Sequence, residues 1–210
     1  MRGAALHFIR RLVSDRAAAT AAEFAMVVPL LLLFIFGIID VGRLMWEWNL
    51  AEKATQMGVR FAVVTDFVPS DLASKDFTQA GATQGSPVNS PLFPGVSCTG
   101  TSAAATCTCK TGSCASFALT GSSAAFNNIV ARMALINSRV THANVVVDYD
   151  PSGLGFAGNP YGPDVAPIVT IRLRNMTFTP ITTQIFRTTI NMPGFPASLT
   201  TEDAAGAASN

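Results

Sequence analysis

Charged side chains are scarce in this sequence. Only 13% of its 210 residues are Asp, Glu, Lys or Arg, whereas soluble domains have about 25%. The formal net charge of +1 gives no reason to expect nucleic acid as a partner. The length allows one modest domain beside a membrane segment, and it excludes two full domains.

Residues that carry catalysis are also few. The chain has two histidines, His7 and His142, and contains no G-x-S-x-G, P-loop or H-E-x-x-H motif. The stretch 148–153 (DYDPSG) lacks the spacing of a calcium-binding EF-hand and is typical of a turn. We therefore expect no enzyme activity, no metal and no cofactor. A membrane-anchored enzyme or ligand-binding receptor is the distant alternative.

One long apolar run explains the low charge. Sixteen residues from Phe24 to Ile39 pass without a charged side chain. Extended back to Ala17, with Glu23 as the one interruption, the run would form roughly 34 Å of helix at about 1.5 Å per residue. That length crosses a hydrocarbon core of about 30 Å. A helix that is apolar all round is buried or spans lipid, so residues 19–40 are predicted to be a transmembrane helix.

The residues around this run predict its orientation. Basic residues precede the run and lie in the first 16 residues, at Arg2, Arg10, Arg11 and Arg16. The positive-inside rule places this end in the cytosol and exports the residues after Asp40. A cleaved signal peptide would have a small-residue A-x-A site after the run, and none is present. The apolar helix is therefore expected to stay in the mature protein, with the leader 1–18 as the segment a cytosolic-side peptidase would remove.

Glu23 is an ionisable residue within the predicted span, where a charge needs a partner. If the chain were cut between Ala18 and Ala19, Glu23 and its neighbour Phe24 would lie one helical turn from a new α-ammonium group. Alternatively, Glu23 marks the cytosolic interface and pairs with Arg16. The sequence leaves both readings open.

The helix is predicted to continue through 41–66 as an amphipathic segment. Its apolar and small residues follow three-and-four spacing, at Val41, Leu44, Met45, Trp48, Ala51, Thr55, Gly58 and Ala62. Asp40 and Arg43 are three residues apart and can pair. Trp46 and Trp48 suit the outer membrane interface, and Pro29 should kink the spanning part.

Residues 67–125 are rich in Ser, Thr, Gly and Pro and show no sustained apolar period, so they are predicted to be a disulfide-containing loop region. All four cysteines lie here, at Cys98, Cys107, Cys109 and Cys114. In an exported, oxidising compartment they predict disulfides, and C-x8-C-x-C-x4-C lacks the C-x2-C spacing of a zinc site. A Cys107–Cys109 bridge is disfavoured by geometry. Two pairings stay open, Cys98–Cys107 with Cys109–Cys114 and Cys98–Cys109 with Cys107–Cys114.

The last third predicts a compact exported head over 126–201, followed by a frayed tail, 202–210. Residues 126–138 have helical spacing, and strands are expected at 144–149 and within 165–178, 180–186, 188–191 and 199–201. The predicted fold class is α+β and pilin-like. A long N-terminal helix, transmembrane and then amphipathic, packs on a small antiparallel sheet with an additional helix.

The N-terminal third resembles the TadE-like family, pilin-like minor components (pseudopilins) of the bacterial tight-adherence (Tad, or Flp) pilus. The residues that carry the resemblance are the stretch 15–25 (DRAAATAAEFA), Pro29 with its leucine run, Asp40-x-Gly42-Arg43, and the downstream Ala51, Ala54, Gly58 and Arg60. It covers roughly residues 10–66. The family usually has glycine before the processing point, where this chain has Ala18.

The resemblance implies a non-enzymatic minor pilin acting in pilus assembly, surface adhesion and biofilm formation. Its partners would be membrane lipid, other pilin-like Tad subunits, the inner-membrane assembly platform and prepilin peptidase. It would sit in the bacterial inner membrane with a periplasmic head, or enter the extracellular fibre. The alternative within the same system is an uncleaved single-pass scaffold or adhesion module.

Overall fold

The computed structural model describes residues 16–88, 90–112, 114, 119–182, 188–201 and 206. The chain divides into two compact units. One contains Met1–Trp46 with Phe178–Ile190, and the other contains Glu47–Thr177 with Asn191–Asn210. Each unit is described separately below.

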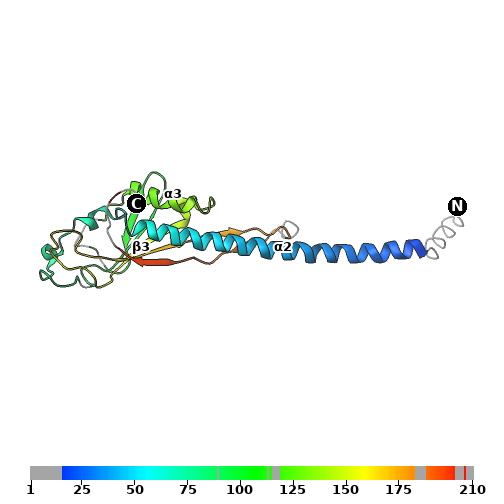
Figure 1. The fold of residues 1–210 in the computed structure, drawn as a ribbon, viewed down its shortest axis with the longest axis horizontal. Helices are drawn as coiled ribbons and strands as arrows, with labels where there is room; N and C mark the ends of the chain where they lie inside the picture. Colours follow the sequence, from blue (N-terminus) through cyan, green and yellow to red (C-terminus); the bar gives the residue numbers. More distant parts are fainter. Residues whose placement is uncertain are drawn as a thin grey trace. The chain divides into compact units, whose positions relative to one another are not determined.

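A single helix, α2 (Arg16–Ala62), contains 47 residues and continues through Pro29 (Figure 1). The predicted long N-terminal helix is therefore confirmed, while a kink at Pro29 stays a prediction. The helix ends four residues before the predicted limit of 66. The residues that follow, Val63, Val64 and Thr65, are all β-branched, and such residues are less favourable in a helix.

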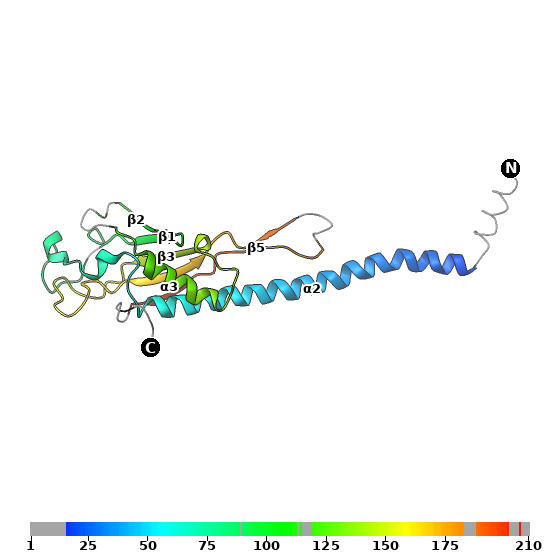
Figure 2. The same cartoon turned by 90° about the horizontal axis from the view of Figure 1, so that it is seen from above.

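In the second unit, five strands form one antiparallel sheet in the order β2-β1-β3-β4-β7. Figure 2 shows β2, β1 and β3 side by side. The strands are β1 (Val96–Gly100), β2 (Ala105–Cys109), β3 (Val145–Asp150), β4 (Ile168–Leu173) and β7 (Ala197–Thr200). With the two main helices, this sheet confirms the predicted α+β class.

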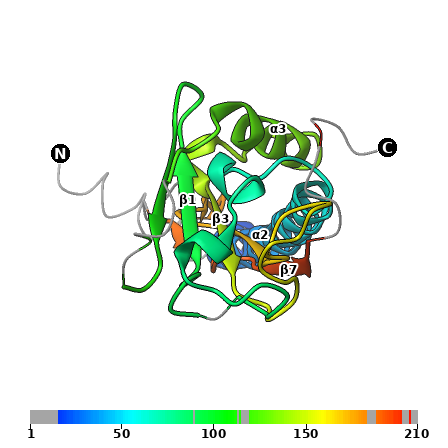
Figure 3. The same ribbon diagram turned by 90° about the vertical axis from the view of Figure 1, so that its left-hand side faces the viewer.

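One face of the sheet forms the core. Val145, Val147 and Tyr149 on β3 and Val169 and Ile171 on β4 point into it and are fully buried. The second helix, α3 (Ser123–Ala134), and the end of α2 lie on this same face (Figure 3). A Cβ added at Gly58 would approach Met133 Cγ to 2.7 Å and Ile171 Cδ1 to 3.3 Å. Glycine therefore lets α2 approach α3 and the sheet closely.

α3 begins before its predicted start at 126 and ends before the predicted 138. The reason is a cap: the Ser122 hydroxyl accepts the backbone N–H of Ala125 at 3.2 Å, which satisfies a free amide of the first turn. The predicted apolar stripe is buried as expected, at Phe126, Ile129, Val130 and Met133.

The chain between α2 and the sheet is tied to the core at Tyr149. Its hydroxyl accepts the N–H of Val68 at 3.1 Å, and its ring meets Phe67 edge-on at 5.6 Å. Burial raises the pKa of Tyr149. Short 3-10 helices follow at η1 (Ser70–Ala73), η2 (Phe77–Ala80) and, before β3, η3 (His142–Asn144).

Two short strands, β5 (Thr177–Phe178) and β6 (Ile190–Asn191), form a separate two-stranded sheet. They correspond to the ends of the strands predicted within 165–178 and at 188–191. Part of the predicted strand 180–186 and most of the predicted tail 202–210 lie outside the described residues.

Candidate functional site

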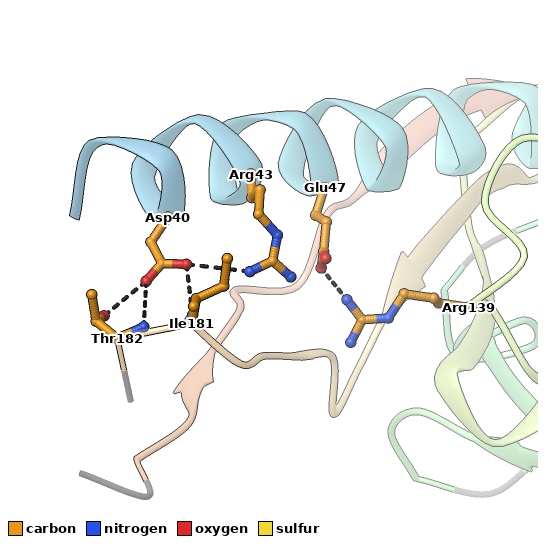
Figure 4. A network of polar contacts seen from close by, with 6 residues as sticks. All are labelled: Asp40, Arg43, Glu47, Arg139, Ile181 and Thr182. Atoms are coloured by element: carbon orange, nitrogen blue, oxygen red, sulfur yellow. Dashed lines mark hydrogen bonds and ion pairs between the residues drawn. The ribbon is translucent and has the colours of Figure 1, made fainter. Parts of the chain in front are cut away.

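Asp40 and Arg43, at the end of the apolar run, form a polar cluster with Ile181 and Thr182, which lie 141 and 142 positions after Asp40. Asp40 is buried, with 6% of its surface exposed. Its Oδ1 accepts the N–H of Ile181 at 2.7 Å, and its Oδ2 accepts the N–H and hydroxyl of Thr182 at 2.8 and 2.7 Å (Figure 4). One carboxylate thus fixes two consecutive backbone amides on the side of α2.

Arg43 completes this cluster from the next helical turn. Its Nη1 donates to Asp40 Oδ1 at 3.2 Å, as the three-residue spacing predicted. The guanidinium also lies over the Phe178 ring, 5.3 Å from its centroid, which is within the range of a cation–π contact. Asp40 and Arg43 therefore hold both ends of the stretch 178–182 against the same face of α2.

Gly42 is not required by packing within the chain. A Cβ added to it meets nothing within 4 Å, so alanine would fit there. Its place in the motif is therefore unexplained by contacts among the described residues, and a role in packing against other helices stays a prediction.

The predicted processing residues lie in the first turns of α2. Ala19, Glu23 and Phe24 are exposed, and among the described residues none forms a hydrogen bond or ion pair with the Glu23 side chain. The side chains of Arg16 and Ala18 are not described, and Arg2, Arg10 and Arg11 lie outside the described residues. The roles predicted for all of these residues in processing and topology therefore remain predictions.

The apolar run itself is exposed along its length. The large hydrophobic side chains from Phe24 to Ile39 are exposed apart from the half-buried Val28, among them Leu30 at 72% and Phe34 at 68%. α2 is long and apolar enough to cross a membrane. Such a surface can be covered by lipid or by other apolar helices.

The structure selects one of the two disulfide pairings that the sequence leaves open. Cys98 bridges Cys107, and Cys109 bridges Cys114. Cys98 and Cys107 lie opposite each other on β1 and β2, with their Cα atoms 4.1 Å apart. No cysteine is free, and the predicted disulfides are confirmed.

Sequence reasoning missed an ion pair on the second unit. Arg139 pairs with Glu47 on α2 (Figure 4), and its Nη2 donates to the carbonyl of Thr177. The partners are 92 residues apart in the sequence, and neither belongs to a motif. No sequence pattern predicts that these two side chains form a pair, so the contact could be found only from the three-dimensional structure.

Two acidic residues near the end of β3 form ion pairs. Asp148 accepts from Arg172 at 2.9 Å, and Asp150 accepts from Lys110 at 2.6 Å. In the described part of the chain, no three His, Cys, Asp or Glu side chains gather where they could hold a metal ion.

Replacing Asp40 tests the cluster. In Asp40→Ala the amides of Ile181 and Thr182 lose their acceptor, which costs about 1–3 kcal/mol for each group left unsatisfied. Hydrogen exchange at Thr182 in detergent-solubilised protein should therefore accelerate by about tenfold or more. Val41→Ala, at the adjacent exposed position, should leave the rate unchanged. An unaltered Thr182 rate in Asp40→Ala would show that the carboxylate does not hold this segment.

Comparison with protein families identifies one match. Residues 18–60 match the family model of the TadE-like proteins. No curated protein matches the chain, and no solved structure matches it. The matched range contains the Glu-Phe-Ala step, Pro29, the Asp-x-Gly-Arg cluster and the small residues up to Arg60. The predicted resemblance is therefore confirmed over this range: residues 18–60 are similar to the TadE-like proteins.

Proposed function

We propose that this protein is a non-enzymatic, pilin-like subunit of the Tad pilus machinery of a bacterium. It is held in the inner membrane by α2 and acts in pilus assembly, surface adhesion and biofilm formation. The observation that carries the proposal is a TadE-like segment whose large apolar side chains from Phe24 to Ile39 are exposed, apart from the half-buried Val28.

The exposed run supports an anchoring role. Burying one large apolar side chain is favourable by about 1.5–3 kcal/mol, so a row of them in water is strongly unfavourable. A lipid bilayer covers the run without any partner. In a fibre, neighbouring apolar helices of similar subunits would cover the run equally well. The same surface can therefore serve the membrane-anchored subunit and the subunit packed in a fibre.

Two independent features support the same orientation. Arg2, Arg10, Arg11 and Arg16 precede the run and favour a cytosolic N-terminus. The disulfides, Cys98–Cys107 and Cys109–Cys114, lie after the run and favour an oxidising compartment such as the periplasm.

Processing supplies the assembly step in this proposal. Prepilin peptidase would cut between Ala18 and Ala19, leaving the apolar helix in the mature subunit. Glu23 would then lie one turn from the new α-ammonium group of its own chain or of a neighbour. Such a pair lowers the cost of both charges among packed helices. Other pilin-like subunits and the inner-membrane assembly platform are the expected partners.

One departure from the TadE-like sequence pattern, at the processing point, favours the second candidate. This candidate is an uncleaved scaffold or adhesion module of the same system. Ala18 stands where the resemblance implies glycine. In this alternative the leader 1–18 is retained, and its arginines stay on the cytosolic side permanently.

Intact-mass measurement of the membrane-extracted protein separates the two candidates. A processed subunit begins at Ala19. We also expect Glu23→Ala to lower the affinity for partner subunits by about a hundredfold or more, since breaking a buried ion pair costs about 3–5 kcal/mol.

The control is Glu52→Ala, which removes an exposed carboxylate from the same helix beyond the run and should assemble normally. A protein that retains residues 1–18, and whose assembly tolerates Glu23→Ala, would exclude the processed subunit and leave the scaffold.

A further inference from the structure

The apolar surface of α2 does not stop where its charged residues begin. Asp40 and Arg43 turn toward the stretch 178–182 and are engaged there. On the helix wheel Val41 and Met45 fall on the other side, and both are exposed, as is the flanking Trp46 at 68%. The outward face of α2 therefore stays apolar for about two turns beyond Ile39.

The segment that Asp40 holds is also uncharged and partly apolar at its surface. We call residues 178–182 and 188–190 the β5–β6 segment, and none of them is charged. Phe178 and Pro180 are buried, whereas Ile181 is 39% exposed and Ile190 is 45% exposed. Isoleucine side chains thus remain uncovered beside a helix whose outward face is itself apolar.

The length of the helix places this region at a membrane surface. From Ala19 to Trp46 the helix rises about 42 Å at about 1.5 Å per residue. A bilayer including its headgroup layers is about 40–45 Å thick, with a core of about 30 Å. If the run to Ile39 fills the core, then Asp40 to Trp46 lie in the outer headgroup layer. Exposed tryptophan is enriched at that depth.

At this depth the protein itself supplies the hydrogen-bond donors of the Asp40 carboxylate. Asp40 accepts from two backbone amides, one hydroxyl and one guanidinium. These donors satisfy it without water. The same bonds fix the β5–β6 segment at the level where the apolar run ends.

We propose that the β5–β6 segment is a second membrane contact, seated at the boundary between lipid headgroups and acyl chains and held there by Asp40. The partner is the lipid interface itself, which accepts apolar side chains to a depth of about 5–10 Å. This inference rests on the proposed function, because it requires α2 to span the bilayer.

Site-directed spin labels test the depth directly. All four native cysteines are in disulfides, so an introduced cysteine is the single free thiol. The full-length protein is reconstituted in phosphatidylethanolamine–phosphatidylglycerol vesicles with one label at a time. Ile181→Cys is the test, Val27→Cys is the control inside the span, and Leu154→Cys is the control on an exposed loop of the second unit.

Accessibility to oxygen, which concentrates in lipid, is compared with accessibility to a water-soluble nickel chelate. The oxygen-to-nickel ratio at 181 should be several-fold higher than at 154 and lower than at 27. Adding Asp40→Ala should move the ratio at 181 toward the value at 154.

Three results would overturn the inference. A ratio at 181 equal to that at 154 places the segment in water, and lipid exposure at 27 would then leave the proposed anchor intact. Dipolar broadening between labels at 181 identifies a second copy of the chain, not lipid, as the occupant. A water-exposed label at 27 removes the spanning helix and the proposed function with it.

Discussion

Arginine introduced in the apolar run, as Leu31→Arg with Phe34→Arg, is expected to release the protein from the membrane. Both side chains are exposed, so the substitutions remove no packing within the chain. Each arginine near the centre of a spanning helix costs about 2.5–3.5 kcal/mol on the insertion scale. Two together cost about 5–7 kcal/mol, which lowers the equilibrium constant for membrane insertion by about four to five orders of magnitude. The measurement is the share of protein in the membrane pellet after alkaline extraction.

The matched control places arginine at exposed leucines of the other unit, Leu135→Arg with Leu154→Arg. These side chains are 76% and 56% exposed, and they are outside the run, so this variant should stay in the pellet. If the run variant is retained as well as the control, the exposed apolar surface of α2 is not buried in lipid. The anchor would then have to be sought elsewhere in the chain.

The apolar helix was predictable because its signal is local. An uncharged run of this length allows few alternatives, and the spacing of Ala51, Gly58 and Ala62 marks the face that is buried in the structure. β3 and β4 were predictable for a similar reason, since runs of valine and isoleucine are typical of buried strands. The observed ends of these strands differ from the predicted ends by a few residues, because caps and turns determine where an element ends.

β1 and β2 were missed because their core side chains are not large hydrophobic residues. Val96 and Cys98 point inward on β1, while Ser97 and Thr99 point outward. If Cys98 is counted as an apolar residue, apolar and polar side chains alternate along β1, as they do in a strand with one buried face. A disulfide to Cys107 fills the place that bulky side chains fill in the other strands. Treating the cysteines as core residues would have predicted the strand.

The Asp40 cluster was only half predictable. The pair of Asp40 and Arg43 follows from helical spacing. The other partners of Asp40 are the backbone amides of Ile181 and Thr182, and every residue except proline has such an amide. No residue type marks the segment that Asp40 binds, so this contact needed the fold.

Removing the Cys98–Cys107 disulfide is expected to destabilise the second unit by about 3–5 kcal/mol. A bridge that closes a short loop contributes about 2–3 kcal/mol by restricting the unfolded chain. Here the bridge also lies in the core, where Cys98 is fully buried between β2 and β3. Cys98→Ala with Cys107→Ala therefore loses buried contacts in addition. Urea unfolding of the full-length protein in detergent, followed by near-ultraviolet circular dichroism, should show a midpoint lower by about 1–3 M.

The second disulfide is the matched comparison. Cys109–Cys114 closes a shorter loop, because its cysteines are 5 residues apart in the sequence, whereas Cys98 and Cys107 are 9 residues apart. Cys109 is also only partly buried. Cys109→Ala with Cys114→Ala should lose about 2 kcal/mol, the smaller of the two effects. If both double variants unfolded at the wild-type midpoint, the sheet would hold without its bridges. β1 and β2, which have few large apolar side chains, would then need another source of stability.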